Sequence, residues 1–166
     1  MDLITATAMS VHNPVLTAVG LFLDNDLAFA ALIIVILLLG ESRNEKRAKV
    51  MLSFFLVFIS ASAIKDLMNV ERPCAGQPFC PDDYSFPSIH AAIAFTLMIA
   101  FLDKRFYGLY LAFALFTAFT RLNIGVHTFR DICGGLALAV VMYYVTDFVW
   151  QSAKRAYEVR RGAAHG

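Results

Sequence analysis

The chain has 166 residues, of which 59% are hydrophobic, and its mean hydropathy is +0.65. These values exclude an ordinary soluble domain, in which about half of the residues are apolar, and they predict an integral membrane protein with the lipid bilayer as its surroundings. The net charge of +1 carries no information by itself and gives no reason to expect a nucleic-acid partner.

The N-terminal segment, residues 1–25, is moderately apolar, is interrupted by polar residues and contains no Lys or Arg. We expect two short interfacial helices, roughly 2–10 and 13–23, that lie in or dip into the membrane interface. The alternative is a first full span, which would place His12-Asn13-Pro14 near the middle of the bilayer. Because no basic region precedes the first apolar stretch, no cleavable signal peptide is expected.

Five apolar segments follow and predict an all-α integral membrane protein, a bundle of about five transmembrane helices. The first of them is short for a span, so tilt or local thinning of the bilayer would have to complete it. We expect a single membrane domain over 1–166, with a transmembrane core in 26–150 and a cytoplasmic tail in 151–166. The five segments are 27–39, 50–68, 88–102, 106–120 and 132–150.

The distribution of Lys and Arg predicts the orientation of the chain in a cell membrane. Ten of the fourteen fall in 41–49, in 103–105 and in the tail. By the positive-inside rule these segments and the C-terminus are cytoplasmic. The other ends of the helices, and any site built there, are then extracytoplasmic.

One of the predicted outer loops, 73–87, contains four of the five prolines and two cysteines, Cys74 and Cys80. An oxidising compartment would permit a disulfide between them. Two free thiols are the alternative, and the sequence does not decide between them.

The segment Arg121–Asp131 places charged residues between two apolar segments. His127 stands four residues before Asp131. If the chain is helical from His127 onward, the two side chains share one face. The carboxylate could then hold the imidazole Nδ1 proton and leave Nε2 free as a nucleophile. The alternative is a helix-start cap at the membrane interface.

Two further clusters lie at predicted helix ends. Lys65 and Arg72 are seven residues apart, so on one helix they would project from the same side, and Pro73 is expected to stop that helix. Ser88 stands where an N-cap belongs, before the apolar run that follows His90. The N–H groups of a helix N-terminus attract anions. Together the clusters provide the cations, hydroxyl, imidazoles and carboxylate needed to hold and cleave a phosphate ester.

These three clusters resemble the signature motifs of the type 2 phosphatidic acid phosphatase superfamily. Lys65–Pro73, Pro87–His90 and Arg121–Asp131 are similar to them in order, internal spacing and placement at helix ends. One position departs from the pattern, because the family most often has glycine where this chain has Ile89. An isoleucine there can still donate its backbone N–H to a phosphate, but it does not permit the closer approach that glycine allows.

The resemblance and the residue chemistry together imply metal-independent hydrolysis of a lipid phosphomonoester or diphosphate. His127 would attack phosphorus and form a phosphohistidine, Asp131 would steady the imidazolium, and His90 would protonate the leaving oxygen and then activate water. The cations supply the charge stabilisation, so no metal or other cofactor is expected. The residues expected to hold the phosphate are Lys65, Arg72, Ser88, Ile89 and Arg121.

The lipid is not identified by these motifs. Phosphatidic acid, phosphatidylglycerol phosphate and a polyprenyl phosphate or diphosphate all fit a site at the membrane interface, and the oligomeric state is not indicated. Transfer of the phosphoryl group to another acceptor would use the same motifs. A transporter is disfavoured because nearly all charges lie at or beyond the span ends. Five further charged residues are expected to be solvated loop charges, with tuning of the site as the alternative: Asp66, Glu71, Asp82, Asp83 and Arg130.

Overall fold

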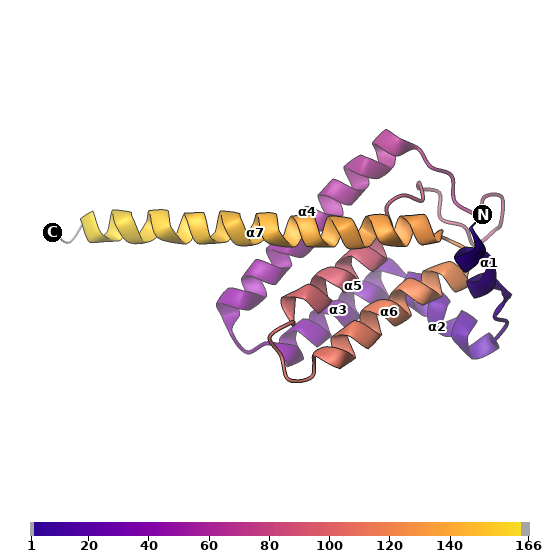
Figure 1. Ribbon diagram of the computed structural model, residues 1–166, viewed down its shortest axis with the longest axis horizontal. Coiled ribbons are helices and arrows are strands. Elements are labelled where there is room, and N and C mark those ends of the chain that lie inside the picture. Colours follow the sequence, from indigo (N-terminus) through magenta and orange to yellow (C-terminus); the bar gives the residue numbers. More distant parts are fainter. Residues whose placement is uncertain (1, 164–166) are drawn as a thin grey trace.

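The computed structural model describes residues 2–163, and in this part of the chain helices and the segments that connect them are present, with no strand (Figure 1). The predicted all-α class is therefore confirmed. The last residues of the expected tail, 164–166, lie outside the described part. The helices are α1 Leu3–Ser10, α2 Pro14–Asp24, α3 Asp26–Gly40, α4 Asn44–Met68, α5 Ile89–Ala100, α6 Tyr107–Asn123 and α7 Phe129–Ala163.

The two short N-terminal helices form within one residue of the predicted bounds. Each is capped by the side chain before it: Asp2 accepts from the backbone N–H of Thr5 at 2.8 Å, and Asn13 accepts from that of Val15 at 2.9 Å. The axes of α1 and α2 differ by 117°. The segment is therefore not a straight first span.

Helix length and composition support two or three membrane spans in the described part of the chain. Helices α4 and α7 are long and apolar enough to cross a bilayer, and α1 with α2 would add a third span if the bent pair counts as one. Helices α3 and α5 are apolar but have 15 and 12 residues, short of the roughly 20 that an upright span needs. The bundle of about five spans stays a prediction.

Two predicted boundaries are wrong. Helix α4 begins at Asn44, so most of the charged segment 41–49 belongs to the helix. It ends at Met68, where the predicted segment ends, but it is stopped by Asn69 in the left-handed conformation (φ 48°) that asparagine tolerates and not by Pro73. Helix α7 continues past Trp150 to Ala163, since neither proline nor glycine interrupts 151–161.

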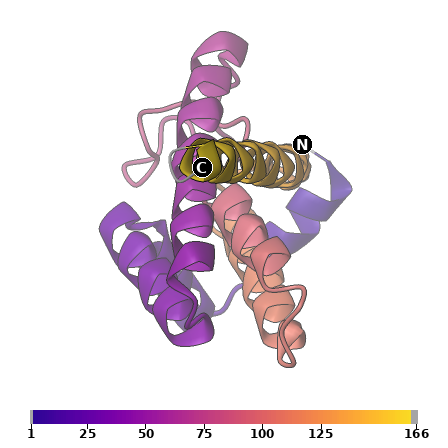
Figure 2. The same cartoon turned by 90° about the vertical axis from the view of Figure 1, so that its left-hand side faces the viewer.

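Helix α5 lies at the centre of the bundle and packs against α4, α6 and α7. Small side chains such as Ala91 and Ala94 are completely buried and let its neighbours approach closely. The contact with α7 is tight, because a Cβ on Gly135 would stand 2.8 Å from the carbonyl oxygen of Ser88. Figure 2 looks along α7 and shows α4 crossing it, with α5 and α6 alongside. This packing fixes the N-terminus of α5 against the start of α7.

A buried carboxylate connects several basic residues at the end of the bundle that is predicted to be cytoplasmic. Glu41, between α3 and α4, is 1% exposed and forms ion pairs with Arg43, Lys46 and Lys104. Hydrogen bonds from Arg43 hold the pKa of Glu41 well below its usual range, although burial opposes the shift. These contacts join the α3–α4 corner to the α5–α6 turn, so the two charged segments lie at the same end.

Candidate active site

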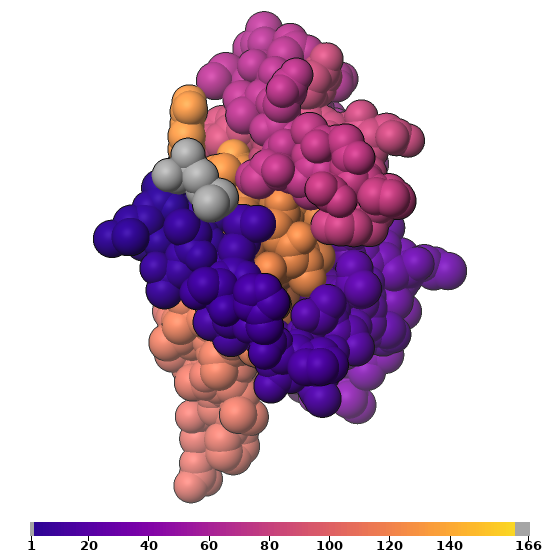
Figure 3. All heavy atoms as spheres, turned by 90° about the vertical axis from the view of Figure 1, so that its right-hand side faces the viewer, coloured from indigo at the N-terminus to yellow at the C-terminus, as the bar shows by residue number. Residues whose placement is uncertain are grey.

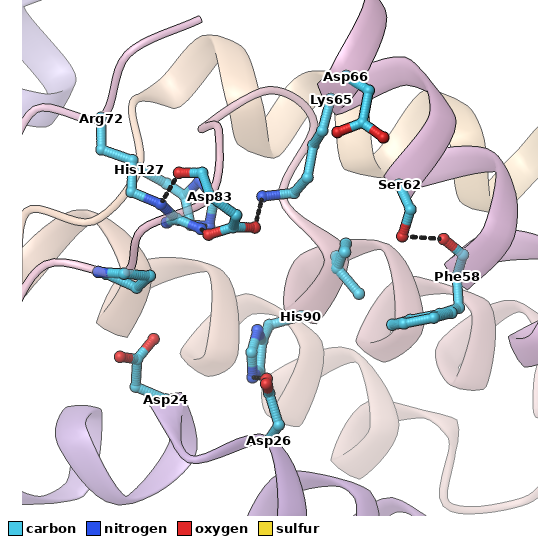
Figure 4. Close-up of a pocket in the computed structure, with 12 residues that line it drawn as sticks. Asp24, Asp26, Phe58, Ser62, Lys65, Asp66, Arg72, Asp83, His90 and His127 are labelled. Atoms are coloured by element: carbon cyan, nitrogen blue, oxygen red, sulfur yellow. Dashed lines mark hydrogen bonds and ion pairs between the residues drawn. The ribbon is translucent and has the colours of Figure 1, made fainter. Parts of the chain in front are cut away.

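The opposite end of the bundle contains a pocket of about 420 Å³ where the three motif segments meet. Its lining includes Lys65 from α4, Arg72 from the loop 69–88, His90 from α5 and His127 from the α6–α7 connection (Figure 4). Figure 3 faces this end and shows the N-terminal helices and the loop after α4 on either side of the segment that joins α6 to α7. Residues far apart in sequence are therefore brought together as the motifs predict.

The first turn of α7 is capped differently from the prediction. His127 lies before the helix rather than in it, because Thr128 takes the N-cap position. The backbone N–H of Thr128 donates to Asp131 Oδ2 at 2.6 Å, and that of Asp131 lies 3.4 Å from Thr128 Oγ1. This reciprocal capping box confirms the cap alternative for Asp131, but its partner is Thr128 and not His127.

His127 and Asp131 nevertheless lie side by side, with 3.7 Å between Nδ1 and Oδ2. Ser85 connects them: its hydroxyl donates to Asp131 Oδ2 at 2.5 Å and lies 3.5 Å from His127 Nδ1. All three side chains are buried. Sequence reasoning missed Ser85, because a single serine in a loop has no charge, spacing or periodicity that distinguishes it.

The other ring nitrogen of His127 faces a cation. Arg72 Nη1 lies 3.3 Å from His127 Nε2. Because a guanidinium only donates, this contact favours an unprotonated Nε2 with the ring hydrogen on Nδ1. Burial above all lowers the pKa of His127, to about 4; Asp131 opposes the shift, and Arg72 and Lys65 add to it. The side chain is 3% exposed and is neutral at pH 7.

Asp83 bridges the two cations of the first motif, so this half-exposed loop carboxylate belongs to the site, as the alternative for it predicts. Its carboxylate lies 2.6 Å from Lys65 Nζ and forms a second ion pair with Arg72 Nη2. Arg72 Nε also donates to the Asp83 carbonyl at 2.9 Å. Burial raises the pKa of Asp83, but the hydrogen bonds from Lys65 and Arg72 outweigh it and the net shift is downward. These contacts, drawn in Figure 4, bring Lys65 and Arg72 together although Arg72 lies beyond the end of α4.

Arg121 does not line the pocket, in contrast to the prediction that it holds phosphate directly. It is fully buried, with Nη1 2.6 Å from Asp24 Oδ1 and Nη2 2.5 Å from the carbonyl of Gly20. Asp24 itself lines the pocket in front of it. No sequence pattern predicts this pairing, because α2 is brought against α6 only by the tertiary fold.

Of the three residues at the start of α5, one caps the helix and two line the pocket. Ser88 is buried, and its hydroxyl accepts from the N–H of Ala91 at 3.4 Å, so it serves the predicted cap but does not line the pocket. Ile89 and His90 do line it. His90 Nε2 has no hydrogen-bond partner and lies 3.5 Å from Asp26 Oδ1. An imidazole with a free nitrogen therefore faces the same cavity as the His127 ring.

The site combines a neutral imidazole held by a carboxylate, a pair of cations and a second imidazole. Such a set can bind a tetrahedral oxyanion, attack it and exchange a proton with its leaving group. Across residues 2–163, no group of three or more His, Cys, Asp or Glu side chains is placed to hold a metal ion. A disulfide joins Cys74 and Cys80 in the loop that carries Arg72 and Asp83.

Comparison with protein families and solved structures places this fold among known proteins. The PAP2 superfamily model matches residues 48–155. The fold is similar to that of LpxE from Aquifex aeolicus, with a TM-score of 0.70 and 19% identity over 86% of this chain and 92% of that one. It is also similar to a PAP2-type phosphatidylglycerolphosphate phosphatase from Bacillus subtilis, with a TM-score of 0.69 and 18% identity over 90% and 83% of the two chains.

Two named relatives are similar in sequence. Human sphingosine-1-phosphate phosphatase 2 is 29% identical over 117 residues, which are 61% of this chain and 29% of the relative. The putative undecaprenyl-diphosphatase YbjG of Escherichia coli strain K12 is 34% identical over 73 residues, or 42% and 37% of the two chains. The matches thus span about a third of the length of these relatives.

Proposed function

The chain belongs to the PAP2 superfamily, and from this membership and the geometry of the pocket we propose that it is a metal-independent lipid phosphate phosphatase. The observation that carries the proposal is the meeting of Lys65, Arg72, His90 and His127 in one pocket. The relatives named above as phosphatases of lipid phosphates and diphosphates support the reaction class.

The first step begins when the phosphate of a lipid replaces the Asp83 carboxylate between Lys65 and Arg72. Both cations then neutralise its oxygens, Arg72 through its planar fork and Lys65 as a point charge. The backbone N–H of Ile89, at the start of α5, adds a neutral donor. Arg121 contributes positive charge from behind Asp24 rather than through direct contact.

The chemistry then proceeds in two displacements. His127 Nε2 attacks phosphorus, the bond from phosphorus to the lipid oxygen breaks, and His90, which enters this step as the imidazolium, gives that oxygen its proton and becomes neutral. Asp131 and Ser85 hold the Nδ1 side of the ring and stabilise the imidazolium. His90 next takes a proton from water, whose oxygen attacks phosphorus. The bond from phosphorus to nitrogen breaks, and inorganic phosphate leaves a neutral His127.

The placement in the membrane follows from charge and helix length. The end with the buried Glu41 cluster faces the cytoplasm with the C-terminus, and the pocket opens at the extracytoplasmic interface. Helices α3 and α5 reach across only if they tilt or if the bilayer thins around them. A substrate could then keep its tail in the outer leaflet while its phosphate enters the pocket.

The test is phosphate release by purified protein from lipid phosphates in the presence of EDTA. The His127→Ala variant removes the nucleophile, and turnover should fall by about four orders of magnitude or more. The matched control is His12→Ala, because His12 is an exposed imidazole of the N-terminal segment that does not line the site. Near-normal turnover by His127→Ala, or loss of wild-type activity with EDTA, would contradict the proposal.

A further inference from the structure

A second cavity, of about 380 Å³, adjoins the pocket and is almost entirely apolar. Four residues line both cavities, Asp26, Phe58, Ile89 and His90, and they define the throat between them. Beyond the throat the lining consists only of apolar side chains from α3, α4 and α5: Phe29, Ala30, Ile33, Ile34, Met51, Phe54 and Ile93.

The second cavity runs along the helices as a groove. From Asp26 to Ile34, α3 rises about 12 Å at 1.5 Å per residue. On α4, which returns in the opposite direction, the lining runs from Phe58 back to Met51. Helix α5 packs against both, whereas α3 and α4 make few contacts with each other. Ile34 and Met51 are 41% and 43% exposed, so the groove is also open sideways to the bilayer.

The throat has two apolar residues whose positions are fixed by the fold. Ile89 is the first residue of α5, directly after the Ser88 cap, and it packs against the buried side chains of Val57, Ala61 and Leu138. Phe58 comes from α4, and Figure 4 shows it apart from the charged residues of the pocket. At these two residues the polar lining of the pocket gives way to the apolar lining of the second cavity.

We propose that Ile89 and Phe58 make the enzyme selective for phosphate esters of a single long hydrocarbon chain over diacylglycerol phosphates. This inference rests on the proposed function. When the phosphate lies at His127, the first carbons of the alcohol pass the throat. A single chain presents only methylene or isoprene carbons there and continues into the groove. A diacylglycerol phosphate branches within two carbons of the ester oxygen, so it brings a second chain and two polar ester groups to the throat. Beyond the throat the lining has only apolar side chains, so burial of the ester groups there without hydrogen bonds is unfavourable.

The experiment compares kcat/KM for a polyprenyl phosphate and for phosphatidic acid in the same detergent, with a short water-soluble aryl phosphate as the reference for the chemistry. The wild type should prefer the single-chain substrate by about tenfold or more, the size of effect that a few carbons produce in an apolar pocket. Ile89→Ala and Phe58→Ala widen the throat, so each should reduce this preference several-fold. Ile34→Trp fills the groove, so it should lower the rate on the polyprenyl phosphate relative to that on the aryl phosphate.

The matched control is Phe55→Ala, which removes a phenyl ring of the same helix that is 59% exposed and lines neither cavity. It should keep the wild-type preference. If the wild type shows no preference, or if Ile89→Ala and Phe58→Ala both retain it, the selectivity proposal is wrong while phosphatase activity stands. If the wild type releases phosphate from none of the substrates, the proposed function itself fails.

Discussion

The carboxylate of Asp83 bridges Lys65 and Arg72, the two cations that a substrate phosphate needs. Replacement by asparagine keeps the shape and removes the charge, so an anionic ligand no longer competes with a carboxylate. We expect Asp83→Asn to bind vanadate or inorganic phosphate about tenfold more tightly, which corresponds to one charge-assisted hydrogen bond. Competitive inhibition constants measured with the aryl phosphate would show it.

Asp82→Asn is the control for this comparison, since Asp82 is exposed and lies outside the pocket. Because the pKa of Asp83 is lowered, its carboxylate is ionised throughout the neutral range. The difference between the Asp83 variant and the wild type should therefore be the same at pH 5.5 and pH 8. Unchanged or weaker inhibition of Asp83→Asn would mean that Asp83 does not compete with phosphate.

His127 should be neutral in the free enzyme over the whole physiological range. Its pKa is lowered to about 4, so the ring gains a proton only in acid and is available as a nucleophile above about pH 5. Titration of ¹⁵N-labelled histidine by NMR, with His127→Ala to assign the signal, measures this directly. A midpoint near the ordinary value of about 6.5 would contradict the buried, cation-flanked environment described above.

The motif spacing correctly predicted that Lys65, Arg72, His90 and His127 meet in one pocket, because each stands at or near the end of a helix and these ends lie together. It did not predict the position of Arg121, whose partner Asp24 comes from a helix about one hundred residues away. Nor did it predict the roles of Asp83 and Ser85, whose contacts depend on how one loop folds over the site. Local pattern determines which residues can carry chemistry, but tertiary packing determines what each one touches.

Helices α5 and α7 approach each other most closely at Gly135, and this contact positions the start of α5. A Cβ there would meet the carbonyl of Ser88 at 2.8 Å and the backbone nitrogen of Ala92 at 3.2 Å. We expect Gly135→Ala to destabilise the protein by about 1–3 kcal/mol, although alanine favours a helix, because backbone atoms cannot yield as a side chain can. It should also reduce turnover, since Ile89 and His90 follow Ser88 directly. Thermal unfolding in detergent and phosphate release measure the two effects.

Gly108→Ala provides the matched control on α6. Gly108 is exposed, and a Cβ there has nothing within 4 Å. Its replacement should stabilise the helix by up to about 1 kcal/mol and leave turnover unaffected. If both variants behave alike, the close contact between α5 and α7 does not position the site.

The positions of the helices could be predicted from apolar segments and N-caps, whereas the residues at which some helices begin or end could not. Ser88 caps α5 as expected, whereas Asp2 and Asn13, placed at the starts of the predicted N-terminal helices, are their N-caps. The end of α4 at Met68 was predicted, but its cause was not, because Asn69 ends the helix by adopting a left-handed conformation before Pro73 is reached. Helix α7 extends beyond the predicted 132–150 because a helix can leave the membrane and continue where apolar residues give way to charged ones.

The two ends of the molecule carry different charge arrangements, and these predict its orientation. The Glu41 end gathers the basic residues of the α3–α4 corner and the α5–α6 turn, and the pocket lies at the other end. In a Cys133→Ser background, a membrane-impermeant thiol reagent on intact cells should label Glu71→Cys in the pocket loop. It should label Ser42→Cys only after the membrane is permeabilised. The opposite pattern would reverse the proposed orientation and place the reaction at the cytoplasmic face.

The proposed mechanism requires that His127 accept the phosphoryl group from a lipid held by Lys65 and Arg72. The most direct measurement is rapid alkaline quenching of the purified enzyme during turnover of a ³²P-labelled lipid phosphate, followed by mapping of the labelled peptide. Alkaline conditions are used because the phosphorus–nitrogen bond is labile in acid. One labelled residue is expected, His127, and the label should be absent from His127→Ala. Label on any other residue, or full turnover with no label on His127 at any quench time, would contradict it.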